Sequence, residues 1–269
     1  MIAGPTAVGK TAEAVRLARE LGTEVVSCDS RQFYREMRIG VARPTDEELA
    51  AVRHHFIACR SVEEPYNIYD YERDAVRRIE ELMATHNEVV AVGGSGLYID
   101  ALKNGVAAMP TPTEELRAEM QALPIEEKRS RLKLVDPDYY ARVDLRNPVR
   151  LQRALEVYYM TGRPYSEVVA GQKPPGRPFG VEVRVLKMEP GLLRERIGRR
   201  VDAMMAEGLM EEVRGLVPWR SLPTLRTVGY RELFPVLDGE TTMEQAVAAI
   251  KLNTWHYARK QMTWMRRYE

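Results

Sequence analysis

Residues Gly4–Thr11 read GPTAVGKT and fit the phosphate-binding loop pattern of Gly, four residues, and Gly-Lys-Ser/Thr. Glycines let such a loop turn its backbone N–H groups toward an anion, and the following helix adds its positive N-terminal end. In this pattern Lys10 reaches the terminal phosphates, and the Thr11 hydroxyl can ligate Mg²⁺. Because only three residues precede the loop, we expect a few natural N-terminal residues to be missing from the sequence.

On both sides of this loop, strands and helices alternate through the first hundred residues. β-Branched runs predict the strands, and apolar residues at helical spacing predict the helices. The strands are predicted at 1–2, 24–28 and 88–92, and the helices at 11–21 and 69–85. Alternation of this kind favours an α/β protein with a doubly wound parallel sheet.

The alternation breaks near residue 105, where Pro110 and Pro112 indicate a linker. Residues 113–162 then contain only helical patterns, followed by a loop rich in Pro and Gly at 171–180. A strand at 181–186 restores the first pattern. We therefore predict an α/β core with a helical C-terminal part at 1–108 and 179–269, and a helical insert at 109–178.

The best-defined helix of the insert begins after Asn147, the N-cap, and ends at Gly162. Arg146, Arg150 and Arg153 recur at i, i+4 and i+7 around its start. Such a stripe is usually a solvated charged face. Here, however, residues 128–153 hold 8 basic and 3 acidic side chains, a net of +5 (8 − 3), which favours a track for phosphates.

Composition excludes several classes of protein. A chain of 269 residues with 45% hydrophobic and 29% charged residues is typical of a globular protein of one large domain, or of one domain with an insert. We find no apolar run near the ~20 residues of a membrane span, and no signal segment. Cys28 and Cys59 are too few for a disulfide framework. We expect a cytoplasmic protein without a membrane segment.

Asp29 directly follows the strand at 24–28. In a doubly wound sheet the carboxyl ends of the strands line the binding crevice, so we expect Asp29 near the phosphate loop. A turn or N-cap aspartate is the alternative interpretation. The strand at 88–92 ends in Gly-Gly-Ser-Gly without the carboxylate that NTPases usually carry there, so the loop alone does not imply nucleotide hydrolysis.

Six spaced motifs together resemble one family, the tRNA dimethylallyltransferases (tRNA isopentenyltransferases), in its bacterial form. The resemblance covers essentially the whole chain, in order. The motifs are GPTA at 4–7, DSRQFY at 29–34 with MRIGVARP at 37–44, GGSGLYI at 93–99, RLQRALEV at 150–157, VGYRE at 228–232 and YARKQMTW at 257–264. The bacterial form lacks the zinc finger of eukaryotic members, which agrees with the two cysteines.

This resemblance implies a P-loop kinase-like doubly wound parallel sheet with a helical insert that binds tRNA. It implies transfer of the dimethylallyl group of dimethylallyl pyrophosphate to the exocyclic amine of the adenosine just 3′ of the anticodon, with release of pyrophosphate. Mg²⁺ is the expected cofactor. The tRNA anticodon stem-loop and the prenyl donor are the expected partners of a monomeric enzyme.

The resemblance also implies roles for particular residues. Asp29 is expected to act as the general base, with Gln32 helping to hold the target base, and Thr11 is expected to hold the metal. The expected catalytic residues are Asp29, Thr6 and Arg200. The expected pyrophosphate-binding residues are Gly4, Pro5, Thr6, Ala7, Val8, Gly9, Lys10 and Thr11. The expected tRNA-binding residues are Asp29, Ser30, Arg31, Gln32, Ser95, Arg117, Val149, Arg150, Leu151, Gln152 and Arg153.

Three alternatives remain open from the residues. An adenylate isopentenyltransferase would prenylate free nucleotides, and it would not need the basic insert. A small-molecule kinase would bind ATP in the same loop and turn it over. An RNA-binding protein with a vestigial loop is the non-enzyme alternative, against which the intact Lys10 and Thr11 argue. Asp29 itself could instead be a metal ligand.

Overall fold

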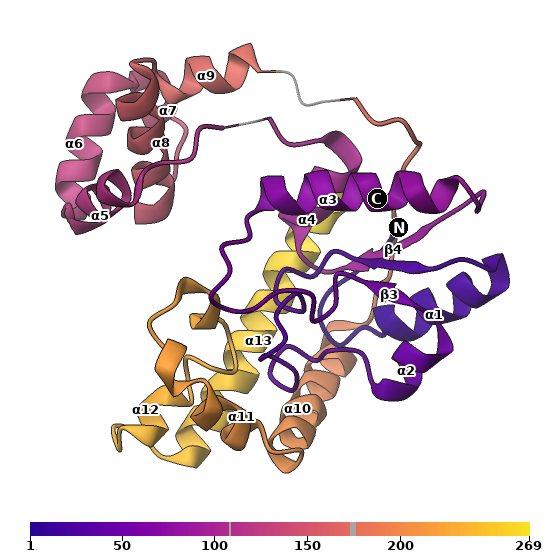
Figure 1. Cartoon of the computed structure of the whole chain (residues 1–269). Helices are drawn as coiled ribbons and strands as arrows, with labels where there is room; N and C mark the ends of the chain where they lie inside the picture. The colour runs from indigo at the N-terminus through magenta and orange to yellow at the C-terminus, as the bar shows by residue number, and fades with distance from the viewer. Residues whose placement is uncertain (108, 173–175) are drawn as a thin grey trace. The chain divides into compact units, whose positions relative to one another are not determined.

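The computed structural model describes residues 1–107, 109–172 and 176–269 (Figure 1). The chain divides into a core unit, Met1–Lys103 with Arg177–Glu269, and a helical unit, Asn104–Gly176. The predicted insert began at 109 and ended at 178, a few residues from these limits. Part of the predicted loop at 171–180 lies outside the described residues.

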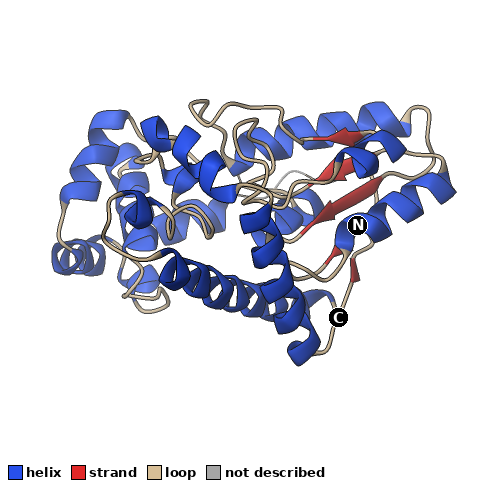
Figure 2. Cartoon of the chain, turned by 90° about the horizontal axis from the view of Figure 1, so that it is seen from below, coloured by secondary structure: helices blue, strands red, loops and turns tan. Residues whose placement is uncertain are grey.

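One parallel sheet organises the core unit. Within the described residues it has five strands in the order β3-β2-β4-β1-β5, shown side by side in Figure 2. Its strands are β1 (Ile2–Ala3), β2 (Val25–Ser27), β3 (His54–His55), β4 (Val90–Gly93) and β5 (Arg184–Val185). In the register, Ile2 lies opposite Val92 on one side and Arg184 on the other. The predicted α/β class with a parallel sheet is confirmed.

Helices surround this sheet in the core unit. They are α1 (Lys10–Leu21), α2 (Asp46–Ala51), α3 (Ile68–Met83), α4 (Gly96–Asn104), α10 (Pro190–Ala206), α11 (Leu209–Gly215), α12 (Phe234–Leu237) and α13 (Met243–Met265), with short 3₁₀ turns at Val217–Trp219, Pro223–Leu225 and Arg266–Tyr268. The last residue of α4 belongs to the helical unit. Among the helices of the described ranges, none combines the length and apolar character that a membrane span requires.

Alternating side chains of the strands explain why helices cover both faces of the sheet. Ile2, Val25 and Val90 pack in one apolar cluster with Ala14 and Ala18 of α1. The neighbouring strand residues pack in a second cluster with α3 and α4; they are Ala3, Val26 and Ala91. Both clusters are fully or almost fully buried, so strands apolar on both faces form the centre of the core.

Local capping chemistry sets the bounds of the main helices. Gly22 ends α1 in the left-handed conformation at φ 62°, which a side chain would resist. At α3, Asn67 and Asp70 form a capping box that satisfies the first backbone N–H groups. These signals place the helices within two residues of their predicted bounds.

Five helices form the helical unit: α5 (Glu114–Ala122), α6 (Ile125–Val135), α7 (Pro137–Tyr140), α8 (Pro148–Thr161) and α9 (Tyr165–Gly171). This count of five helices covers the described residues of the unit, which are 104–107, 109–172 and 176. Met120, Leu132, Leu151 and Leu155 form its core, each fully buried. Asp136 is also buried, and its carboxylate accepts the N–H of Tyr139 and both the N–H and the hydroxyl of Ser166.

Helix α8 has the predicted start and stop. The Asn147 side chain accepts the N–H of Arg150, and Gly162 ends the helix at φ 68°. The prediction that Arg146 extends a helical stripe with Arg150 and Arg153 is wrong. Arg146 precedes the N-cap and pairs with Asp144 at 3.4 Å, so it does not lie on the helix.

Strand β3 carried no prediction, and the predicted strand at 181–186 is only Arg184–Val185. Two adjacent histidines show no apolar alternation, so only pairing with β2 identifies them as a strand. His55 contacts the Glu24 carboxylate and His54 the carbonyl of Val52. Strand β5 is short because its partner β1 offers only two residues.

Candidate functional site

Three loops meet at the carboxyl edge of the sheet. β4 lies between β2 and β1, so the loop after each of these strands opens at the same edge. The loop after β1 is Gly4–Gly9, the loop after β4 begins at Gly94, and the loop after β2 begins at Cys28. The predicted pyrophosphate loop, Ser95 and Asp29 are thus brought to one place by topology alone.

The phosphate loop has an unusual backbone. Ala7 has φ 66°, and Gly9, the N-cap of α1, has φ 103°. Both values lie in the left-handed region, where a residue with a β-carbon is strained. Alternating right- and left-handed residues point successive N–H groups to one side, which makes an anion-binding concavity. This geometry agrees with the predicted pyrophosphate loop.

Gln261 of α13 fixes the loop from the far end of the chain. Its Oε1 accepts the N–H of Thr6 at 2.8 Å, and its Nε2 donates to the carbonyl of Gly94 at 2.8 Å. A β-carbon on Gly94 would collide with this amide, so the close approach requires glycine. Gln261 is buried and ties the loops after β1 and β4 together. The sequence carried no prediction of this role.

Three cationic side chains gather at the phosphate loop. The Lys10 ammonium donates to the Pro5 carbonyl at 2.7 Å, and Arg200 of α10 donates to the Thr6 hydroxyl at 3.3 Å. The Arg196 guanidinium lies 3.9 Å from the place where a β-carbon on Gly9 would be. The predicted residues Thr6, Lys10 and Arg200 therefore lie together.

These charges are only partly compensated. The pKa of Lys10 is lowered to about 8, mainly by burial and in part by the positive charge of Arg200, while attraction by Asp29 opposes the shift. Burial also lowers the pKa of Arg200, and the positive charge of Arg196 adds to that effect. Like charges held together at such cost indicate a site for a multiply charged anion.

Asp29 has a role in the turn and a free carboxylate oxygen. Its Oδ1 accepts the N–H of Arg31 at 3.0 Å, and its own N–H donates to the Ser27 hydroxyl at 3.3 Å. The alternative interpretation as a turn aspartate is therefore correct as local geometry. It does not compete with a role in the site, because Oδ2 has no hydrogen bond within the described residues.

Cys28 and Tyr257 border this carboxylate. The Cys28 thiol is fully buried and donates to the Val92 carbonyl at 3.2 Å, and burial raises its pKa to about 12. Tyr257 of α13 is one turn before Gln261 and 43% exposed. Burial of its hydroxyl and the negative charge of Asp29 raise the pKa of Tyr257 to about 12. The phenol is therefore a neutral group beside Asp29 and the half-buried Ser95, and the sequence predicted no role for it.

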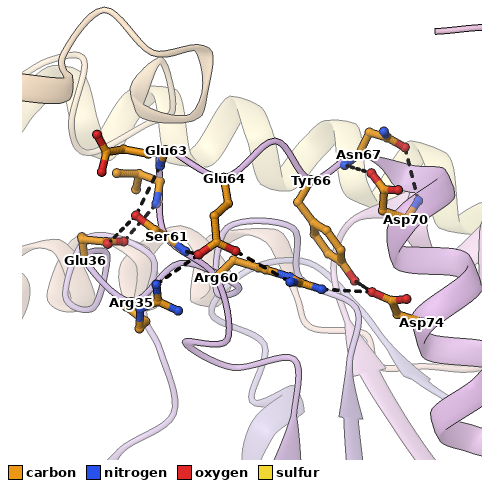
Figure 3. Close-up of polar contacts among 11 residues, drawn as sticks. Arg35, Glu36, Arg60, Ser61, Glu63, Glu64, Tyr66, Asn67, Asp70 and Asp74 are labelled. Carbon is orange, nitrogen blue, oxygen red and sulfur yellow. Dashed lines mark hydrogen bonds and ion pairs between the residues drawn. The ribbon is translucent and has the colours of Figure 1, made fainter.

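The loop after Asp29 is anchored by a polar network that Figure 3 shows. Arg60 lies between Glu64, at 3.7 Å, and Asp74 of α3, at 3.1 Å. Arg35 donates to Glu64 at 3.2 Å, and the Glu36 carboxylate accepts the Ser61 hydroxyl at 2.8 Å. Residues 35 and 36 are thereby tied to the segment before α3.

Backbone hydrogen bonds complete this anchor. Arg35 donates its N–H to the Arg60 carbonyl at 2.8 Å, Arg60 donates to Phe33 at 2.9 Å, and Ala58 donates to Gln32 at 2.9 Å. Ser30, Arg31 and Gln32 are half-buried within this braced turn. The turn is consequently fixed before any ligand arrives.

The predicted tRNA-binding residues of the helical unit differ in exposure. Arg117, Arg150 and Val149 are exposed, and Val149 is 72% exposed. Arg153 is half-buried and contacts Glu156 at 3.4 Å and the Pro110 carbonyl at 2.9 Å.

Two members of that predicted set point inward within the unit. Leu151 is fully buried in its core, so its side chain supports the helix and offers no surface to a ligand. Gln152 is half-buried and donates to Glu156 at 2.8 Å. The exposed Arg117 and Arg150, together with the half-buried Arg153, are therefore the side chains of this set that can meet phosphates.

The residues present fit a Mg²⁺ ion shared with a phosphate ligand. No group of three His, Cys, Asp or Glu side chains that could hold a metal alone occurs among the described residues. Thr11 is half-buried in the first turn of α1, and its hydroxyl makes no hydrogen bond within the described residues. Mg²⁺ typically takes one or two protein ligands, with water and substrate phosphates completing the octahedron.

The chain is similar to known proteins over almost its whole length. A tRNA dimethylallyltransferase of Christiangramia forsetii is 44% identical over 270 residues, 99% of this chain and 89% of that protein. The crystal structure of a tRNA isopentenylpyrophosphate transferase from Bacillus halodurans is 35% identical, with a TM-score of 0.69 over 98% of this chain and 85% of that one. A eukaryotic dimethylallyltransferase acting on tRNA is 26% identical, with a TM-score of 0.83 over 98% and 68% of the two chains.

A family model agrees with these similarities over most of the chain. The model described as IPP transferase matches residues 32–268, which include Gln32, Arg200 and Gln261. The match, together with relatives above 40% identity over the whole length, shows the family directly. The chain belongs to the IPP transferase family.

Proposed function

We propose that this protein transfers the dimethylallyl group of dimethylallyl pyrophosphate to the exocyclic amine of the adenosine just 3′ of a tRNA anticodon. One observation carries the proposal. A loop shaped for a multiply charged anion, with Lys10 and Arg200, opens beside the carboxylate of Asp29. An anionic leaving group and a proton acceptor are the two parts that this transfer requires.

The loop holds the leaving pyrophosphate. Its backbone N–H groups, Lys10, and Arg200 beside Thr6 supply positive charge where negative charge grows as the allylic C–O bond breaks. We assign the core unit to the P-loop kinase-like folds, with pyrophosphate in place of nucleotide phosphates. Mg²⁺, held by Thr11 and the pyrophosphate oxygens, would supply further charge neutralisation.

Asp29 prepares the acceptor amine. The lone pair of an adenine amine is delocalised into the ring, so the amine is a weak nucleophile. As the new C–N bond forms and the C–O bond breaks, one amine proton passes to the Asp29 carboxylate, and pyrophosphate departs with the C–O electron pair. The adenine must leave its stack to reach a donor on the loop, so we expect a flipped-out base.

The exposed arginines of the helical unit supply the RNA contacts. Arg117 is exposed, and within the stretch of basic excess at 128–153, Arg146 and Arg150 are exposed and Arg153 is half-buried. Phosphate contacts of this kind give affinity and orientation without reading the base sequence. The choice of adenosine must then come from the core unit. A monomer in the cytoplasm remains our prediction for the state and location of the enzyme.

One assay separates this function from its alternatives. Labelled dimethylallyl pyrophosphate is supplied with tRNA, with AMP, or with no acceptor, and the labelled products are separated. Label in tRNA supports the proposal, and label in AMP alone identifies an adenylate isopentenyltransferase. Turnover of ATP without prenyl transfer identifies a kinase, and RNA binding without turnover of dimethylallyl pyrophosphate or of ATP identifies a binding protein.

A further inference from the structure

Glu212 of α11 holds a loop of the core unit by its backbone. Its Oε2 accepts the N–H groups of Arg38 at 3.0 Å and Ile39 at 2.7 Å, and its Oε1 accepts that of Gly40 at 3.1 Å. The hydroxyl of Tyr230 donates to the same Oε1 at 2.6 Å. Four donors thus converge on one carboxylate.

Tyr230 packs against the same loop at Gly40. The ring is fully buried, and a β-carbon on Gly40 would lie only 2.5 Å from its Cζ, so the loop must have glycine at this point. Burial raises the pKa of Tyr230, and the negative charge of Glu212 raises it further. The phenol therefore remains protonated and donates to the carboxylate.

Gln32 contacts the same loop at the two residues after Gly40. Gln32 Nε2 donates to the carbonyls of Val41 at 3.3 Å and Ala42 at 2.9 Å. An amide nitrogen has two hydrogens, and both are used here. Gln32 Oε1 has no hydrogen bond within the described residues. The loop therefore orients the Gln32 amide so that its oxygen is available to accept a hydrogen bond from a ligand.

We propose that Glu212 is a positioning residue that, through the loop at 38–42, fixes Gln32 as a hydrogen-bond acceptor for the exocyclic amine of the acceptor base. The inference rests on the proposed prenyl transfer. An amine has two N–H groups, so Asp29 takes one as the bond forms and Gln32 Oε1 holds the other. A base with a carbonyl oxygen at this position has no proton to donate and would face two acceptors, so a base with an exocyclic amine, such as adenine, is preferred over one with a carbonyl.

The test compares Glu212→Gln with the neighbouring control Glu211→Gln. Glu211 is exposed, and its one ion pair within the described residues is with Arg214, at 3.2 Å. The substituted amide at 212 cannot accept all four donors, so the loop should shift and the Gln32 amide should lose its fixed orientation. We expect the KM for tRNA to rise about tenfold, within the roughly 100-fold that a misplaced group can cost. The KM for the donor should stay within about twofold, and the control should match the wild type.

A double-mutant cycle with Gln32→Ala distinguishes positioning from general stability. If Glu212 acts through Gln32, the double variant is no worse for tRNA than Gln32→Ala alone. Additive losses, or equal rises in both KM values, overturn the inference. Should Glu212→Gln fail to fold, Tyr230→Phe removes a single donor, and the same cycle decides. A wild type that prenylates no RNA would instead overturn the proposed function.

Discussion

The cationic side chains at the phosphate loop and those that we assign to RNA contacts are held in opposite ways. In the core unit, Lys10 and Arg200 are partly dehydrated, bound to loop atoms and held beside like charge. In the helical unit, the Arg146 side chain is 89% exposed and Arg150 is also exposed. Coulomb interactions are strong where water is excluded and are screened where it is not. We therefore expect a small number of charges in the core unit to control the rate of the chemical step. We expect many exposed charges in the helical unit to contribute a little each to RNA affinity.

The strongest test of this contrast is Asp29→Asn. Removing a general base typically costs about 10²–10⁴-fold in rate, and the amide keeps the shape of the turn. We expect prenyl transfer to be lost while the affinities for tRNA and for Mg²⁺–dimethylallyl pyrophosphate remain. Rapid-quench transfer assays and equilibrium binding provide the two measurements. Loss of Mg²⁺-dependent donor binding would assign Asp29 to the metal site instead.

Lys10→Ala tests the dehydrated charge directly. Loss of one preorganised group at a developing negative charge costs about 10²–10³-fold in turnover. Binding of tRNA should survive, and Arg19→Ala, an exposed substitution at the other end of α1, should change neither. Steady-state kinetics with tRNA in excess measure the effect. Near-normal turnover of the Lys10 variant would remove the distinction between the two units.

The pH dependence of kcat/KM also tests the role of the partly dehydrated charge of Lys10. The pKa of Lys10 is lowered to about 8, so the ammonium is charged below pH 8 and loses its proton above it. The kcat/KM for the donor reports the free enzyme, and we expect it to fall by up to about tenfold per pH unit above pH 8. The Lys10→Ala variant should lack this decrease. An unchanged alkaline decrease in that variant would attribute it to another group.

The smallest effect belongs to the helical unit. Replacing Arg150 and Arg153 with Ala should weaken tRNA binding by a few fold and reduce the slope of log affinity against log salt by about 0.7–0.9 per lost phosphate contact. Filter binding at several salt concentrations measures both quantities. Arg163→Ala, an exposed arginine of the same unit that pairs with Glu167, is the control. An unaltered slope would show that Arg150 and Arg153 make no phosphate contacts in the complex.

Parts of the molecule that depend on neighbours in sequence could be predicted. The phosphate loop and α8 follow from residues such as Gly9, Asn147 and Gly162, whose preferred conformations are local. Asp29 was placed correctly at the edge of the sheet because parallel strands share that edge.

Contacts between distant segments could not be predicted. Gln261, Glu212 and Tyr257 act through partners that only the tertiary fold brings near, and a lone Gln, Glu or Tyr on a helix has no pattern of its own. Arg146 was placed on a helix because its spacing matched the stripe, although Asn147 as N-cap already required the helix to begin after it.

The bond between Thr6 and Gln261 has a consequence for the nascent chain. Ribosomes deliver a protein from its amino end, and folding follows that order. The amide that fixes the phosphate loop is made 255 residues after Thr6, so the loop emerges well before it. We therefore expect a half-made chain to display the loop without its final shape, which the loop should take only when α13 packs into place.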